Sequence, residues 1–253
     1  MVIGEMGSRE SEPNKADKLI FNPDRDIPQE AWEEMDYNLE QRRGAASKFY
    51  GGISWQASKM KILDPSRDID INAKERKGMK NNIEAQSQAG QWLAFANHII
   101  EMKVLCSDKD VKITKADWEG MRASLERSRK ENDWDFAKLA AAMKILNPNE
   151  DLKLDEATWQ RMRDKLEEGR RMHNWQGFFS EQAVAMKILN PDEDLKLDQA
   201  TCQDMRNELE RMQKDRSGNG YATRAVEMKI LAAEKVEAKD RRLEITMPEK
   251  AEK

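Results

Sequence analysis

The sequence predicts an all-α protein built from tandem helix-loop-helix repeats of about 42 residues, stacked as an α-solenoid-like array. The main observation is a tetrad, Met-Lys-Ile-Leu or once Met-Lys-Val-Leu, which recurs at nearly constant spacing. The tetrads begin at Met60, Met102, Met143, Met186 and Met228. The second observation is that amphipathic stretches flank each tetrad, and such a helix pair needs neighbours to bury its apolar faces.

The first helix of each repeat is expected to begin near an aromatic residue and to end at the tetrad. The aromatic residues are Tyr50, Trp92, Trp134, Trp175 and Tyr221. Three tetrads lead into Asp64-Pro65, Asn147-Pro148 or Asn190-Pro191, and proline cannot continue the helical hydrogen-bond pattern. The last copy has Ala-Ala at this place, so its helix is expected to run on.

The second helix of each repeat is expected to start at a residue that can cap it. The candidate N-caps are Asn72, Thr114, Asp155 and Asp198. Glu75 and Asp117 stand three residues after the first two caps and complete capping-box patterns. These signals fix the start of each second helix.

An apolar stripe with the pattern Trp-x-x-Met-x-x-x-Leu occurs in three copies, which begin at Trp32, Trp118 and Trp159. The opposite face is charged, and we expect Arg161, Asp164, Lys165 and Glu168 to be solvated there. Most of the 15 methionines fall at two fixed repeat positions. They can fill the core or form an adaptable binding groove, and their place on the apolar stripe favours the core.

The chain is expected to divide into three segments. Residues 1–16 are polar and lack periodicity, which predicts disorder, and residues 243–253 are expected to form a flexible tail. Residues 17–242 are expected to form a single helical-repeat domain. Its truncated first unit begins at 17, its full repeats start near 60, 102, 143 and 186, and a capping helix starts from about 221.

The repeat length and the two-helix unit resemble the α-solenoid class, which includes tetratricopeptide and HEAT-type arrays. The tetratricopeptide signature of spaced Trp, Gly, Tyr and Pro in a shorter period is absent. The resemblance implies an architecture and transfers no functional residue.

The loop after the first full tetrad weakly resembles the calcium loop of the EF-hand. Its candidate ligands are Asp64, Ser66, Asp68, Asp70, Asn72 and Glu75. The sixth loop position, which is Gly in that family, is Ile69 here. The same residues can serve as turn formers and as a capping box without metal. Calcium therefore stays an alternative for this loop, and no other cofactor is indicated.

Enzyme motifs are lacking. His98 falls inside an expected helix and His173 in a loop, at unrelated repeat positions. Neither belongs to a metal-binding or nucleophilic pattern, and no glycine-rich phosphate loop follows a strand. Cys202 replaces a repeat tryptophan and is expected to be a small core residue. We expect the protein not to be an enzyme.

The composition limits the classes of partner that the protein is expected to bind. The chain has 253 residues, a formal net charge of −4 and 36% charged residues, and no run is apolar enough to span a membrane. Two cysteines far apart are expected to be reduced, and together with the polar N-terminus they predict a cytoplasmic protein. Repeat arginines are interleaved with acids, which makes nucleic-acid binding the least favoured alternative. The arginines are Arg161, Arg163, Arg170, Arg171, Arg206 and Arg211.

The sequence therefore predicts a non-catalytic repeat protein that binds other proteins or associates with itself, because repeat arrays offer large surfaces. A calcium-binding helix-loop-helix protein is the first alternative. A nucleic-acid-binding repeat protein is the second.

Overall fold

The computed structural model describes residues 21, 23–44, 50–106, 111–131, 133–171 and 178–232. Throughout these residues the regular secondary structure is helical, and they contain no strand, as the sequence predicts. The expected N-terminal segment 1–16, the tail 243–253, His173 and Trp175 lie outside the described residues.

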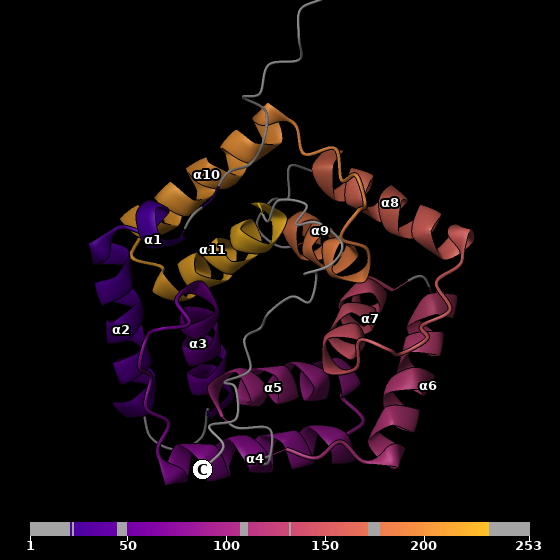
Figure 1. Cartoon of the computed structure of the whole chain (residues 1–253), viewed down its shortest axis with the longest axis horizontal. Helices are drawn as coiled ribbons and strands as arrows, with labels where there is room; N and C mark the ends of the chain where they lie inside the picture. The colour runs from indigo at the N-terminus through magenta and orange to yellow at the C-terminus, as the bar shows by residue number, and fades with distance from the viewer. Residues whose placement is uncertain are drawn as a thin grey trace, which may run out of the picture.

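Two sets of helices alternate along the chain, and Figure 1 shows one set outside the other. After the short α1 (Pro23–Asp26), the outer set consists of α2 (Gln29–Gly44), α4 (Ala73–Gln88), α6 (Lys115–Glu131), α8 (Glu156–Arg171) and α10 (Gln199–Lys214). The inner set consists of α3 (Tyr50–Leu63), α5 (Trp92–Leu105), α7 (Asp135–Leu146), α9 (Phe178–Leu189) and α11 (Gly218–Ala232). The outer helices form the sides of a pentagon.

The helices close into a ring (Figure 1). Each inner helix contacts the next inner helix in the chain, and the last one, α11, contacts α3 and α2. The helix that the sequence analysis expected to cap the array from about residue 221 is α11. It does not end an open stack, because the first helices of the chain cover one of its sides.

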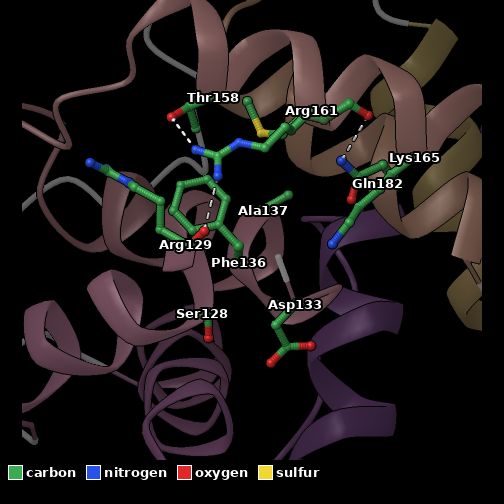
Figure 2. A pocket seen from close by; sticks show the side chains of 10 residues that line it. Ser128, Arg129, Asp133, Phe136, Ala137, Thr158, Arg161, Lys165 and Gln182 are labelled. Carbon is green, nitrogen blue, oxygen red and sulfur yellow. Dashed lines mark hydrogen bonds between the residues drawn. The ribbon is translucent and has the colours of Figure 1, made fainter. Parts of the chain in front are cut away.

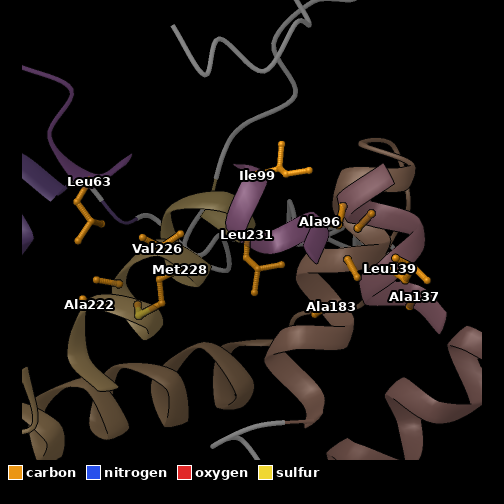
Figure 3. Close-up of a cluster of buried hydrophobic side chains, with 14 of the residues drawn as sticks. Leu63, Ala96, Ile99, Ala137, Leu139, Ala183, Ala222, Val226, Met228 and Leu231 are labelled. Atoms are coloured by element: carbon orange, nitrogen blue, oxygen red, sulfur yellow. The ribbon is translucent and has the colours of Figure 1, made fainter. Parts of the chain in front are cut away.

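The core runs around this ring and is rich in methionine and alanine. The repeated methionines are all buried: Met35, Met60, Met79, Met102, Met121, Met143, Met162, Met186, Met205 and Met228. Figure 3 shows part of the core, with side chains from all five inner helices, among them Leu63, Ile99, Leu139, Ala183 and Met228. The methionines therefore fill the core, and the alternative of an exposed methionine groove is wrong. Cys202 is buried as expected.

The turn after an inner helix follows from its Asx-Pro sequence. The amide of Glu150 donates to the carbonyl of Asn147 at 2.9 Å, and the Asn147 side chain accepts from the amide of Asn149 at 3.2 Å. The turns beginning at Asp64 and Asn190 have the same pair of bonds. Proline at the second turn position and Asx at the first favour this geometry, because proline fixes φ and Asx bonds to the backbone ahead.

All four predicted N-caps accept a hydrogen bond from the backbone three residues ahead. Asn72 and Asp198 bond to the amides of Glu75 and Thr201, and Thr114 and Asp155 to those of Asp117 and Thr158. The capping boxes at Asn72 and Thr114 are complete, because the side chains of Glu75 and Asp117 accept a hydrogen bond from the backbone amide of the cap residue. These starts are confirmed.

The tetrad lysine links the helices to the loops. Lys61, Lys144 and Lys187 each donate to a carbonyl in the turn that follows their own helix. Lys229 of α11 instead donates to the carbonyls of Ile62 and Leu63 at the end of α3, at 2.7 and 3.2 Å. The same repeat residue thus closes the ring at its last copy, because a lysine near a helix C-terminus satisfies carbonyls that lack helical partners.

Candidate functional site

The first half of the predicted calcium loop forms a turn. The Oδ1 atom of Asp64 accepts hydrogen bonds from the amide and the hydroxyl of Ser66, at 2.9 and 2.5 Å. These bonds lower the pKa of Asp64, with the Ser66 hydroxyl as the largest cause. Asp68 and Asp70 are exposed. The loop carboxylates therefore bond locally or face solvent.

The second half of this loop is a helix start. Asn72 and Glu75 bond reciprocally, and the buried Glu75 also accepts from Nε of Arg43 at 2.9 Å. Arg43 further donates to the carbonyl of Asp70. An arginine thus holds the acid that would be the bidentate calcium ligand in an EF-hand.

The backbone of the loops differs from that of an EF-hand as well. In the two later loops the residues with positive φ are Lys153 and Lys196, at 48° and 49°, one position after the place of the EF-hand glycine. The residues that the structure describes contain no group of three or more His, Cys, Asp or Glu side chains able to hold a metal ion. The six predicted ligands are therefore neighbours in a capped turn, and calcium binding stays a prediction.

His98 lies in α5 beside two residues that recur in catalytic sites. Its Nδ1 is 3.0 Å from Oε2 of Glu101, and the hydroxyl of Ser54 in α3 donates to the same oxygen at 2.6 Å. In a nucleophilic relay the serine hydroxyl bonds to the histidine, which is then able to take its proton. Here Ser54 donates to Glu101 instead, so the hydrogen bonds among these three side chains link α3 to α5.

A second buried polar cluster occupies the equivalent place between α9 and α11. Arg224 donates to both the Ser180 hydroxyl and a Glu227 carboxylate oxygen. Burial raises the pKa of Glu227 although Arg224 opposes this shift. Because the same serine-glutamate arrangement recurs at two interfaces with His98 or Arg224 as the third member, it is a packing device of the inner helices.

A pocket between α6, α7 and α8 is the strongest candidate for a binding site (Figure 2). Its charged lining consists of Arg129 on α6, Arg161 and Lys165 on α8, and the exposed Asp133 before α7. We call these residues, with Phe136 and Thr158, the cationic pocket. Cations therefore outnumber carboxylates in its lining.

Arg129 is held in place by its neighbours. Its guanidinium donates to the carbonyl of Leu152 at 2.6 Å and lies over the Phe136 ring, 5.4 Å from the ring centre. Its buried Nε has no hydrogen-bond partner among the residues that the structure describes. A buried N–H of this kind costs free energy unless a ligand or water accepts from it.

Arg161 extends from α8 toward Arg129 and Phe136 (Figure 2). It donates to the carbonyl of Arg129 at 3.1 Å and to the hydroxyl of Thr158 at 3.2 Å, both neutral oxygens. No carboxylate in the described part of the chain forms an ion pair with Arg161. The Asp155 carboxylate interacts with Arg161 electrostatically without a direct ion pair, so the charge of Arg161 is only partly compensated within the protein.

Lys165 brings the third positive charge. The residue is only 9% exposed, and its Nζ lies 5.1 Å from the centre of the Trp134 ring. Burial lowers the pKa of Lys165, while Asp133 and Glu168 act in the opposite direction. The net direction means that this environment disfavours the ammonium relative to water.

The size of the cationic pocket limits its ligand. The centre of a water-sized molecule can move through about 20 Å³ in it, which holds a water molecule or one small ionic group and no metabolite. The mouth of the pocket opens to solvent.

Sequence reasoning missed this site because it placed Arg161 and Lys165 on a solvated face. That expectation was wrong for Lys165, which is buried, and right for Asp164 and Glu168, which are exposed. Lys165 directly precedes Leu166 of the apolar stripe and so lies at its edge. The sequence did contain a signal for this site, because no other repeat has a cation at the positions of Arg161 and Lys165.

Comparison of the chain with protein-family models, with curated proteins and with solved structures gives no match. None of the described helices combines the length and hydropathy that crossing a membrane requires.

Proposed function

We propose that the protein is a non-catalytic binding scaffold that presents a rigid helical ring to a protein partner. The observation that supports this most is that some positions of the repeat keep their residue type and others vary. The buried methionines, the N-caps and the Asx-Pro turns recur from unit to unit, whereas other outward positions change in charge and size. A common frame with variable surfaces is typical of repeat proteins that bind other proteins.

The charges on the outer helices support a protein partner over a nucleic acid. Arg163 pairs with Glu156 and Glu193, and Arg211 pairs with Glu208 and Asp215. Paired arginines release few counterions from a phosphate backbone, so they add little to nucleic-acid affinity. The two buried thiols, Cys106 and Cys202, fit the cytoplasmic location that we propose with this function.

The contact surface that we assign to the partner includes Tyr37 on α2. Its side chain is 59% exposed, and it is the one exposed large hydrophobic residue among the residues that the structure describes. Tyrosine is enriched among residues that dominate binding energy at protein interfaces, because it offers a large and rigid contact at low entropy cost.

The test is site-specific photo-cross-linking in the native cells. A photoreactive phenylalanine analogue replaces Tyr37, and a second chain carries it at Lys115 of α6, a side chain that is 91% exposed. The proposal expects one discrete adduct, formed from position 37 and not from position 115. Absence of any adduct from either position, together with a monomer in size-exclusion chromatography with light scattering, would contradict it. An adduct between two copies identifies self-association as the form of binding.

A further inference from the structure

We propose that the cationic pocket binds a single small oxyanion group, with carboxylate or phosphate oxygens as the ligand atoms. The inference goes beyond the proposed scaffold function, because a free anion would fill the pocket as well as an acidic or phosphorylated side chain of a partner. It rests on the charge, the burial, the sibling comparison and the size of this pocket.

The charges converge from separate elements. Arg129 comes from α6, and Arg161 and Lys165 come from α8, while Phe136 of α7 forms the apolar wall beside the two guanidinium groups. Asp133 is the one carboxylate in the lining, and it is exposed at the edge. An anion entering here meets charge-assisted donors, which bind oxyanions more strongly than neutral donors do.

Neutral donors complete the site. Thr158 and Gln182 both line the pocket, and both are nearly fully buried. Thr158 orients Arg161 through its hydroxyl, and the Gln182 amide is fixed by donation to the carbonyl of Met162 at 3.3 Å. The donors are thus held in place before a ligand arrives, which lowers the entropy cost of binding.

The sibling repeats show that the fold does not require these cations. The residues equivalent to Arg161, each directly before the repeated methionine of an outer helix, are Glu34, Gly78, Gly120 and Asp204. The residues equivalent to Lys165 are Asn38, Asn82, Ser124 and Glu208. By contrast, an arginine like Arg129 also occurs as Arg43 and Arg170, and each of the three donates to a carbonyl of the next loop. Arg129 therefore serves the frame, and Arg161 and Lys165 are additions of one unit.

Lys165, one of these additions, has a cost in the empty protein. Its burial disfavours the charged form of the side chain. An anion in the pocket would offset this cost, because its negative charge stabilises the ammonium. Groups that destabilise a fold in this way are concentrated at binding sites.

The experiment is a calorimetric titration of the full chain with inorganic phosphate and, separately, with acetate, in a buffer of low ionic strength. The variants are Lys165→Met and Arg161→Met, which keep most of the side-chain volume. Lys115→Met is the matched control, because it also removes one positive charge, from a side chain that is 91% exposed.

We expect saturable binding with one site in the wild type and in Lys115→Met, weakened about tenfold or more in both pocket variants. Without anion, Lys165→Met should melt at the same or a higher temperature than the wild type, which shows that its weaker binding is not misfolding. Stronger binding of phosphate than of acetate assigns the pocket to a phosphoryl group, and the reverse order assigns it to a carboxylate. Equal affinity in all four proteins, or no saturable binding of either anion, would overturn the proposal.

Discussion

Glu150 illustrates how single residues connect neighbouring units. It lies in the turn between α7 and α8, where it accepts from Nε of Arg122 on α6 at 2.7 Å and from the Asn147 amide at 3.1 Å. The Arg122 bond is the largest cause of a lowered pKa for Glu150, and burial opposes it. Glu193 repeats this contact with Arg163 one unit later.

This lowered pKa predicts how stability depends on pH. The folded protein binds fewer protons at Glu150 than the unfolded chain, so the contribution of Glu150 is complete above its ordinary pKa of 4.5 and is lost as the pH falls below that value. Glu150→Gln should therefore unfold at lower urea concentration than the wild type at pH 7, and the difference should shrink between about pH 5 and pH 3. Urea unfolding curves over this range measure it. A difference that stays constant with pH would mean that the carboxylate charge is not involved.

At the scale of one element, the loop 64–75 is a device for starting α4. Asn72→Ala removes the cap and half of the capping box, and we expect it to cost about 1 kcal/mol of unfolding free energy. Asn81→Ala, at an exposed position inside α4, is the control and should cost nothing.

The same measurement addresses calcium. Because Arg43 and Asn72 already occupy the carboxylate of Glu75, millimolar calcium should change neither the wild-type melting temperature nor the loss caused by Asn72→Ala. Melting curves with chelator and with calcium make the comparison. A saturable rise of the melting temperature at micromolar calcium would instead establish a metal loop at 64–75.

The elements were predictable because their signals are local. The caps at Asn72, Thr114, Asp155 and Asp198 and the Asx-Pro turns depend on bonds across two to three residues, and the sequence placed them correctly. The cationic pocket was not predictable in this way. It needs Arg129 and Lys165 from different helices to meet, and a helical pattern does not tell whether a residue at the edge of an apolar stripe is covered by its neighbour.

At the scale of the whole molecule, closure of the ring is the feature that repeat periodicity does not determine. The repeat predicts that units stack, but the rotation from one unit to the next decides whether the stack stays open or meets its own start. Here α11 reaches α3 and α2, and Lys229 bonds to the end of α3 across most of the chain. Closure gives every described inner helix an inner-helix neighbour on each of two sides.

Hydrogen exchange of α3 tests this closure most directly. Leu231→Ala shortens a buried side chain of α11, and Leu146→Ala makes the same change at the equivalent tetrad position of α7. If the ring is closed, amide exchange in residues 50–63 should be faster in Leu231→Ala than in the wild type and unchanged in Leu146→Ala, because α11 covers α3 whereas α7 packs on α5, α6 and α9. Unchanged exchange of residues 50–63 in Leu231→Ala, with faster exchange limited to α10 and α11, would contradict the ring.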